Sequence, residues 1–261
     1  MKRFTVCLLV LLVCTTAFAG STASTTTYTD SFSFLSSYPN YVKLYETINN
    51  CCTASEVEAA FEALKANLGS STKDWTVLLK ASLNCAHYYL EIAEKKNSKK
   101  AKQLISNAEA IYEALEKSGS MAGQSMLKAL KFTCLSIGYL ASPMSISKGL
   151  ESVSVIDEAY EEAPNELSIA LLYAARKLNA PAIGGGDAKE AFGVFTSLCN
   201  YAESEGANVL PWDKFDIYCN LAKCYTKMDE KTLALQYYYK ALSIYNHNDT
   251  VITEIGKLEA K

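Results

Sequence analysis

Apolar residues recur at intervals of three and four positions along nearly the whole chain from residue 39 onward. This spacing places apolar side chains on one face of an α-helix, whereas the two-residue alternation of a β-strand never persists. The pattern therefore predicts an all-α protein. The expected helices span residues 39–49, 55–67, 74–94, 98–117, 121–141, 145–161, 165–178, 188–204, 213–227, 230–245 and 250–259.

Several helix ends carry residues that stabilise a helix terminus. Thr53 with Glu56 has the spacing of a capping box, and Asp187 with Glu190 has the same spacing with an acidic first residue. Side-chain oxygens are also expected to accept from free N–H groups at two further helix starts, and glycines to end three helices. These residues are Asp74 and Asp229 at the starts, and Gly69, Gly119 and Gly206 at the ends.

Helices of similar length in close succession suggest an internal repeat, and the clearest unit lies near the C-terminus. Its two helices carry alternating aromatic, leucine and small residues at Tyr218, Leu221, Ala222, Tyr225, Ala234, Tyr238 and Ala241. Small residues let two antiparallel helices approach to roughly 8–10 Å, and large aromatics fill the space between hairpins. With longer loops, the same template fits Phe132, Leu135, Tyr139 and Gly149, and then Ala191 and Phe195.

These spacings resemble those of the tetratricopeptide (TPR) superfamily over roughly residues 38–248. The resemblance implies stacked antiparallel helical hairpins that form a right-handed superhelix, an α-solenoid, with residues 249–261 as a C-terminal capping helix. In TPR proteins the first helix of each hairpin lines the concave face. Carried over to this chain, that rule indicates a polar groove for an extended peptide or a carboxylate, with ordinary solvated surface as the alternative interpretation. The groove residues would be Tyr173, Arg176, Asn179, Asn220, Lys223 and Lys227.

A narrower similarity lies in residues 179–187, where Pro181 is followed by a glycine-rich turn ending at Asp187. The segment looks like small exported bacterial TPR proteins, and also like the T component of TRAP transporters. The second similarity would imply a periplasmic accessory subunit that handles a small ligand with a solute-binding protein. A phosphate-binding turn is the weaker interpretation, because the turn follows a helix and Asp187 would repel a phosphate.

The first 19 residues have the anatomy of a secretory signal peptide. Lys2 and Arg3 precede the largely apolar run Phe4–Val13, and Ala17–Ala19 forms a cleavage site before Gly20. A competing interpretation takes residues 11–14 as a lipobox, which would leave a lipid anchor on Cys14. The Ser/Thr-rich residues 20–37 are expected to form a flexible spacer, with ordered structure beginning near Tyr38. No later segment is apolar for long enough to span a membrane.

Composition narrows the functional classes. The formal net charge is −3, and removal of the leader makes it more negative, which argues against nucleic-acid binding. Two histidines are few for acid–base or metal chemistry, so we expect no metal, no cofactor and no catalytic residue. No cysteine spacing supports a zinc site. Free buried thiols are the expectation for Cys51, Cys52, Cys85, Cys134, Cys199, Cys219 and Cys224.

Leader and repeat together favour an exported, non-enzymatic scaffold of the periplasm or envelope of a bacterium. Such a module would bind a protein or peptide partner in its concave groove. The transporter accessory subunit is the alternative, and an enzyme is a third class that the scarcity of histidine and paired acids disfavours.

Overall fold

The computed structural model describes residues 26–119 and 123–260 of the chain, and this part is helical apart from one isolated bridge. The predicted leader at residues 1–19, with Cys14, and residues 20–25 of the predicted spacer lie outside the described residues. The all-α class is confirmed, and each predicted helix is present. The α-helices are α1 (Pro39–Asn49), α2 (Ala54–Ala66), α3 (Thr72–His87), α4 (Ser98–Ser118), α5 (Gln124–Ala141), α6 (Ile146–Glu162), α7 (Leu167–Asn179), α8 (Ala188–Ala202), α9 (Pro211–Lys227), α10 (Lys231–Leu242) and α11 (Asp249–Glu259).

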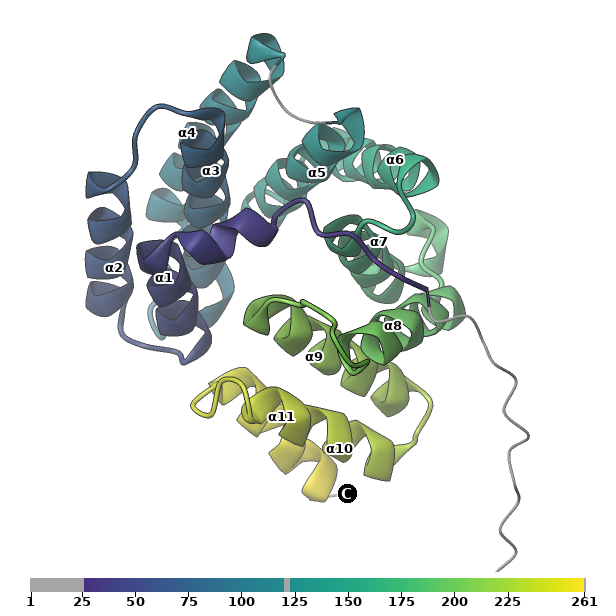
Figure 1. Cartoon of the computed structure of the whole chain (residues 1–261). Helices are drawn as coiled ribbons and strands as arrows, with labels where there is room; N and C mark the ends of the chain where they lie inside the picture. The colour runs from purple at the N-terminus through teal and green to yellow at the C-terminus, as the bar shows by residue number, and fades with distance from the viewer. Residues whose placement is uncertain (1–25, 120–122, 261) are drawn as a thin grey trace, which may run out of the picture.

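The helices pack as antiparallel hairpins that follow one another along the sequence. The closest packing joins α1 with α2, α3 with α4, α5 with α6, α7 with α8, and α9 with α10. In Figure 1 the first helices of the hairpins surround the centre of the molecule, and their partners lie farther out. Short loops and the apolar stripe on each helix account for this arrangement, because consecutive helices bury their stripes against each other.

Small residues set the close approach of paired helices. Ala222, Ala234 and Ala241 are completely buried where α9 and α10 meet. Between α5 and α6, an added Cβ at Gly149 would lie 3.4 Å from the ring of Tyr139, so any larger residue at that position would press on the ring. Tyr139 itself is 41% exposed, unlike most of the other residues of the repeat pattern, because it covers the outside of this hairpin rather than filling its core.

Aromatic residues fill the space between the last hairpins, as the repeat predicts. Tyr225 of α9 stacks on Tyr237 of α10, with ring centroids 5.5 Å apart, and meets Phe192 of α8 edge-on at 5.4 Å. The three rings therefore join α8 to the α9–α10 pair, with a gain beyond simple burial of apolar area.

The predicted capping devices are confirmed in part. Thr53 and Glu56 form a reciprocal capping box at α2. At α3, however, the N-cap is Ser71, and Asp74 is the third residue of the helix that completes the box. The prediction of Asp229 as a cap is wrong: its φ is 62°, and α10 begins after Glu230 without a side-chain cap.

The N-terminal segment, residues 26–37, packs against the helices. Composition predicted a flexible spacer up to residue 37, but Tyr28 is 7% exposed, Phe32 2% and Leu35 0%. Tyr28 belongs to the apolar core around α7–α11, whereas Phe32 and Leu35 belong to the core around α1–α6. The segment thus crosses from one half of the molecule to the other, as the purple ribbon of Figure 1 shows. Burial of these three apolar side chains holds the segment in place, although serines and threonines surround them in the sequence.

The two ends of the hairpin series also meet. The side-chain amide of Asn248, just before α11, donates to the carbonyl oxygen of Asn49 at the end of α1, with 2.7 Å between the atoms. Trp212 at the start of α9 stacks on Tyr45 of α1 with ring centroids 5.1 Å apart, and it meets Tyr41 edge-on at 5.7 Å. The helices therefore close around the centre of the molecule.

Candidate functional site

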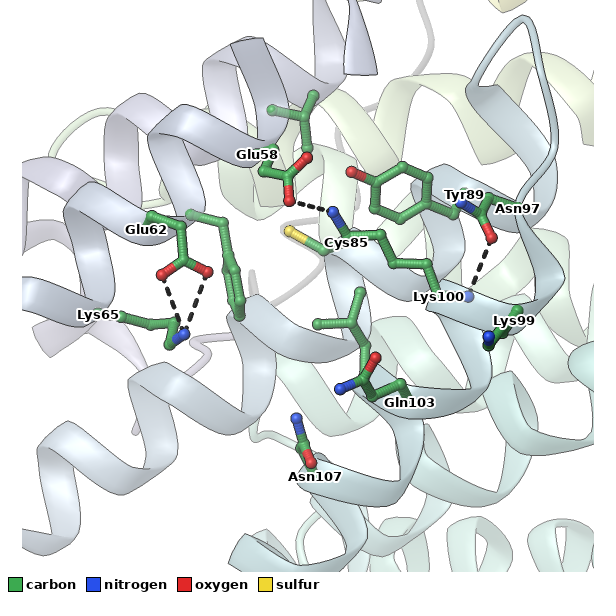
Figure 2. Close-up of a pocket in the computed structure, with 13 residues that line it drawn as sticks. Glu58, Glu62, Lys65, Cys85, Tyr89, Asn97, Lys99, Lys100, Gln103 and Asn107 are labelled. Carbon is green, nitrogen blue, oxygen red and sulfur yellow. Dashed lines mark hydrogen bonds and ion pairs between the residues drawn. The ribbon is translucent and has the colours of Figure 1, made fainter. Parts of the chain in front are cut away.

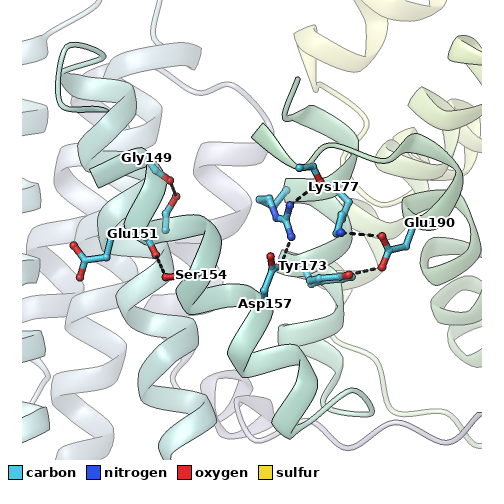
Figure 3. A network of polar contacts seen from close by, with 10 residues as sticks. Gly149, Glu151, Ser154, Asp157, Tyr173, Lys177 and Glu190 are labelled. Atoms are coloured by element: carbon cyan, nitrogen blue, oxygen red, sulfur yellow. Dashed lines mark hydrogen bonds and ion pairs between the residues drawn. The ribbon is translucent and has the colours of Figure 1, made fainter. Parts of the chain in front are cut away.

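Two of the predicted groove residues, Tyr173 and Arg176 on α7, are enclosed in a polar network (Figure 3). The Tyr173 ring stacks on Tyr160 with centroids 3.9 Å apart, and its hydroxyl donates to the carboxylate of Glu190. Burial, together with that carboxylate, raises the pKa of Tyr173 well above its usual value. Arg176, which is 8% exposed, pairs with Asp157.

The same network fixes the glycine-rich turn before α8. Arg176 donates to the carbonyl oxygen of Gly185 at 2.9 Å, and Lys177 pairs with Glu190 at 2.9 Å. Asp187 accepts from the N–H groups of Lys189 and Glu190, so the turn serves to start the helix. Tyr173 and Arg176 therefore join α6, α7 and α8, and they do not line an open groove.

Two more predicted groove residues also interact with helix ends. The ammonium of Lys227 donates to the carbonyl oxygen of Leu178 at 2.6 Å, close to the C-terminal end of α7. This position suits a cation, since the last carbonyls of a helix lack partners within it. Asn179 is exposed, and its amide donates to the carbonyl oxygen of Ala175 one turn earlier.

The remaining pair, Asn220 and Lys223, belongs to a stripe on α9 that continues through Asp213 and Asp216. These positions are three or four residues apart and share one helix face. Lys80, Asn84 and His87 share a face of α3 in the same way. Charges on the two stripes influence each other, since Lys80 lowers the pKa values of Asp213 and Asp216, and Lys223 lowers that of His87. We call the seven residues of the two stripes the inner polar face.

Charged groups of the inner polar face lack close partners. Within the described residues, no ion pair within 4.0 Å involves Lys80, Asp213 or Lys223, and none of their side chains makes a hydrogen bond. The outer helices differ, because several lysines there are held by neighbouring carboxylates, as Lys240 of α10 is by Glu203 at 2.6 Å. Of the three inner groups, Lys223 is exposed and can reach another molecule.

Burial shifts the pKa values of these groups toward their neutral forms. It raises the pKa of Asp216 to about 6, although Lys223 and Lys80 oppose the shift. Burial raises the pKa of Asp213 well above its usual value, and Asp30 adds to the effect. It lowers the pKa values of Lys80 and His87. In each case desolvation is the largest cause, because burial disfavours the charged form of the group.

The N-terminal segment covers one end of this face. The ammonium of Lys80 lies 4.2 Å from the ring centroid of Phe32. One oxygen of Asp30 accepts from the N–H of Phe32 at 2.9 Å, and the other is buried without a partner. Asp213 is 8% exposed, whereas Lys223, at the other end of the α9 stripe, is exposed. The Lys223 end is therefore the accessible one.

Sequence reasoning placed Asn220 and Lys223 on the inner side but missed Lys80, Asp213 and Asp216. Asp213, Asp216, Asn220 and Lys223 are three or four residues apart in the sequence. This spacing could have predicted that Asp213 and Asp216 share a helix face with Asn220 and Lys223. No local signal connects Lys80 with α9, because that contact depends on how the hairpin series closes.

Other candidate chemistry finds little support in the described part of the chain. No group of three or more His, Cys, Asp or Glu residues there could hold a metal ion. Its seven cysteines are unpaired, and only Cys51 and Cys52 are partly exposed. Among the described helices, none is both long and apolar enough to cross a membrane.

Comparison with known proteins gives no match: no family model, curated protein or solved structure resembles the chain significantly.

Proposed function

We propose that this protein is an exported, non-enzymatic interaction module of the TPR type, which holds a segment of a partner protein on its inner polar face. The sequential hairpins, with their first helices toward the centre, support the TPR-type interpretation. In that interpretation the series curves as a right-handed superhelix, and its inner side is the binding surface. The leader in the sequence supports a location in the periplasm or envelope of a bacterium.

One observation carries the proposal: Lys80, Asp213 and Lys223 of the inner polar face make no ion pair or side-chain hydrogen bond among the described residues, and Asp213 is buried as well. Unpaired polar groups in such a position are costly unless a ligand satisfies them. The amides of Asn84 and Asn220 already donate to the Tyr41 hydroxyl and to the carbonyl oxygen of Asp216, and their side-chain carbonyl oxygens would accept from main-chain N–H groups of an extended peptide. A peptide carboxylate would lie near Lys223, at the accessible end, and a basic side chain would lie toward Asp216.

The proposal is tested by selection from a library of random peptides with free C-terminal carboxyl groups, using the purified protein as bait. We expect selected peptides to bind the wild-type protein and to lose roughly tenfold or more in affinity on Lys223→Glu, which converts an attraction into a repulsion. Lys117→Glu is the matched control, because Lys117 is exposed on the outer helix α4. Equal losses from both substitutions, or no enrichment of any peptide, would exclude the inner polar face as a peptide site.

A further inference from the structure

A second recess lies away from the inner polar face, between α2, α3 and α4 (Figure 2). Its volume is about 420 Å³, which is in the range of small-molecule sites. It shares only α3 with the inner polar face, and there it is lined by Cys85 rather than by Lys80, Asn84 or His87. We call it the outer pocket.

The floor of the outer pocket is apolar. Val57 is completely buried, Leu104 is 6% exposed, and Phe61 is 9% exposed. The Cys85 thiol is also buried, and burial raises its pKa to about 12, so it is a neutral, weakly polar group there. A ligand with an apolar chain or ring would contact these side chains.

One polar atom interrupts this floor. Tyr89 is 4% exposed, and its buried hydroxyl interacts with the Lys100 ammonium but makes no hydrogen bond of good geometry. Tyr89 belongs to the π-helical turn η2 (Tyr88–Ile92), in which the N–H of Ala93 reaches the carbonyl oxygen of Tyr88. Single π-helical turns occur often at functional sites. The hydroxyl proton of Tyr89 has no acceptor, which is unfavourable in a buried position, and a ligand oxygen would accept it.

Positive charge gathers beside this hydroxyl. The ammonium of Lys100 lies 5.1 Å from the centroid of the Tyr89 ring and pairs with Glu58 across the pocket. Lys99 is exposed and forms no ion pair among the described residues. Both lysines are in the first turn of α4, whose positive dipole end also favours an anion. The two lysines and the dipole of α4 therefore favour a negatively charged group near the Tyr89 hydroxyl.

We propose that the outer pocket binds a small amphiphilic carboxylate, with its apolar chain or ring on Phe61 and Leu104. The carboxylate accepts from the Tyr89 hydroxyl and from the Lys100 ammonium. Glu58 competes for the same ammonium, so the ligand takes the place of an internal ion pair. This site is independent of the peptide site that we propose on the inner polar face.

The experiment uses isothermal titration calorimetry of the purified protein with sodium octanoate, and with 1-octanol as the neutral counterpart. We expect octanoate to bind roughly tenfold more tightly than octanol, because only the acid gains a charged hydrogen bond. Lys100→Met is expected to remove this preference, and Tyr89→Phe to weaken octanoate binding by about fivefold. Glu58→Gln is the sharpest variant: removal of the competing carboxylate should tighten octanoate binding.

Lys117→Met is the matched control, since it removes a lysine of α4 far from the pocket and should leave the affinity unchanged. Circular dichroism checks that each variant is folded. Equal affinities for octanoate and octanol would overturn the proposal, as would weaker octanoate binding in Glu58→Gln or the absence of saturable binding at millimolar concentration. None of these outcomes bears on peptide binding to Lys223, so the two proposals fail separately.

Discussion

Asp216 on the inner polar face shows how position changes the chemistry of a single residue. Burial raises its pKa from 3.8 to about 6, and the opposing charges of Lys223 and Lys80 do not cancel the effect. A carboxyl with a raised pKa in the folded state binds a proton that the unfolded chain has already released. Its contribution to stability therefore falls as the pH rises from about 4 to about 6, and it is at its minimum above that window.

Replacement of Asp216 by Asn should remove this penalty. We expect the variant to be more stable than the wild type at pH 7 by about 1–2 kcal/mol, and its free energy of unfolding to fall less between pH 4 and pH 6. Urea denaturation across that pH range measures both. Some pH dependence will persist, since the pKa of Asp213 is also raised. Glu94→Gln, at an exposed position, is the control; an identical pH profile for the wild type and Asp216→Asn would contradict the interpretation.

At the scale of elements, the N-terminal segment is joined to the helices by one buried carboxylate. Glu166, just before α7, is 7% exposed. It accepts from the N–H of Ser31 at 2.6 Å and from the hydroxyl of Thr29 at 2.7 Å. Main-chain bonds beside it pair Thr29 with Asn165 and Leu167. Local pairing of this kind explains how a serine- and threonine-rich segment stays in place.

Glu166→Ala should release the segment. We expect a loss of about 2–3 kcal/mol in the free energy of unfolding, because three donors, including the Ser31 hydroxyl at 3.2 Å, lose a charged acceptor. Relative to the wild type, the variant should also show faster hydrogen exchange in residues 28–35, whereas exchange in α5 should change less. Glu161→Ala removes an exposed glutamate of α6 and should change stability by less than about 0.5 kcal/mol. Equal effects of the two substitutions would show that the Glu166 contacts do not hold the segment.

The sequence predicted the helices well because helical periodicity is a local property that each segment carries alone. Contacts between segments that lie far apart in the chain were harder to predict from the sequence. The packing of Phe32 and the stacking of Trp212 on Tyr45 bring together residues far apart in the chain, and no spacing rule predicts them. Arg176 was predicted on the groove because in TPR proteins the first helix of each hairpin lines the concave face, but its partner Asp157 lies on another helix and encloses it.

At the scale of the whole molecule, closure joins the first hairpin to the last. An open series of hairpins contacts only its neighbours and can unfold from its ends. Here α1 contacts α9 through Tyr45 and Trp212, and the N-terminal segment contributes to both apolar cores. The ends are thus held by contacts that a linear stack lacks, which favours cooperative unfolding.

The two tryptophans allow this to be measured, since Trp75 lies in α3 and Trp212 in α9. We expect the urea transition reported by Trp75 fluorescence in Trp212→Phe to coincide with the circular dichroism transition of the same variant. In the same way, the urea transition reported by Trp212 fluorescence in Trp75→Phe should coincide with the circular dichroism transition of Trp75→Phe. Both tryptophans pack in the apolar core around α1–α6, whereas circular dichroism reports all helices, so separate transitions in either variant would show that the molecule does not unfold as one cooperative unit.

Hydrogen exchange with and without a selected peptide shows whether the inner polar face holds a peptide segment. We expect slower exchange in α3 and α9, around Asn84 and Asn220, and no change in the outer helix α4 away from its start. Slower exchange confined to α2 and α4, or no change in α3 and α9 at saturating peptide, would contradict this expectation.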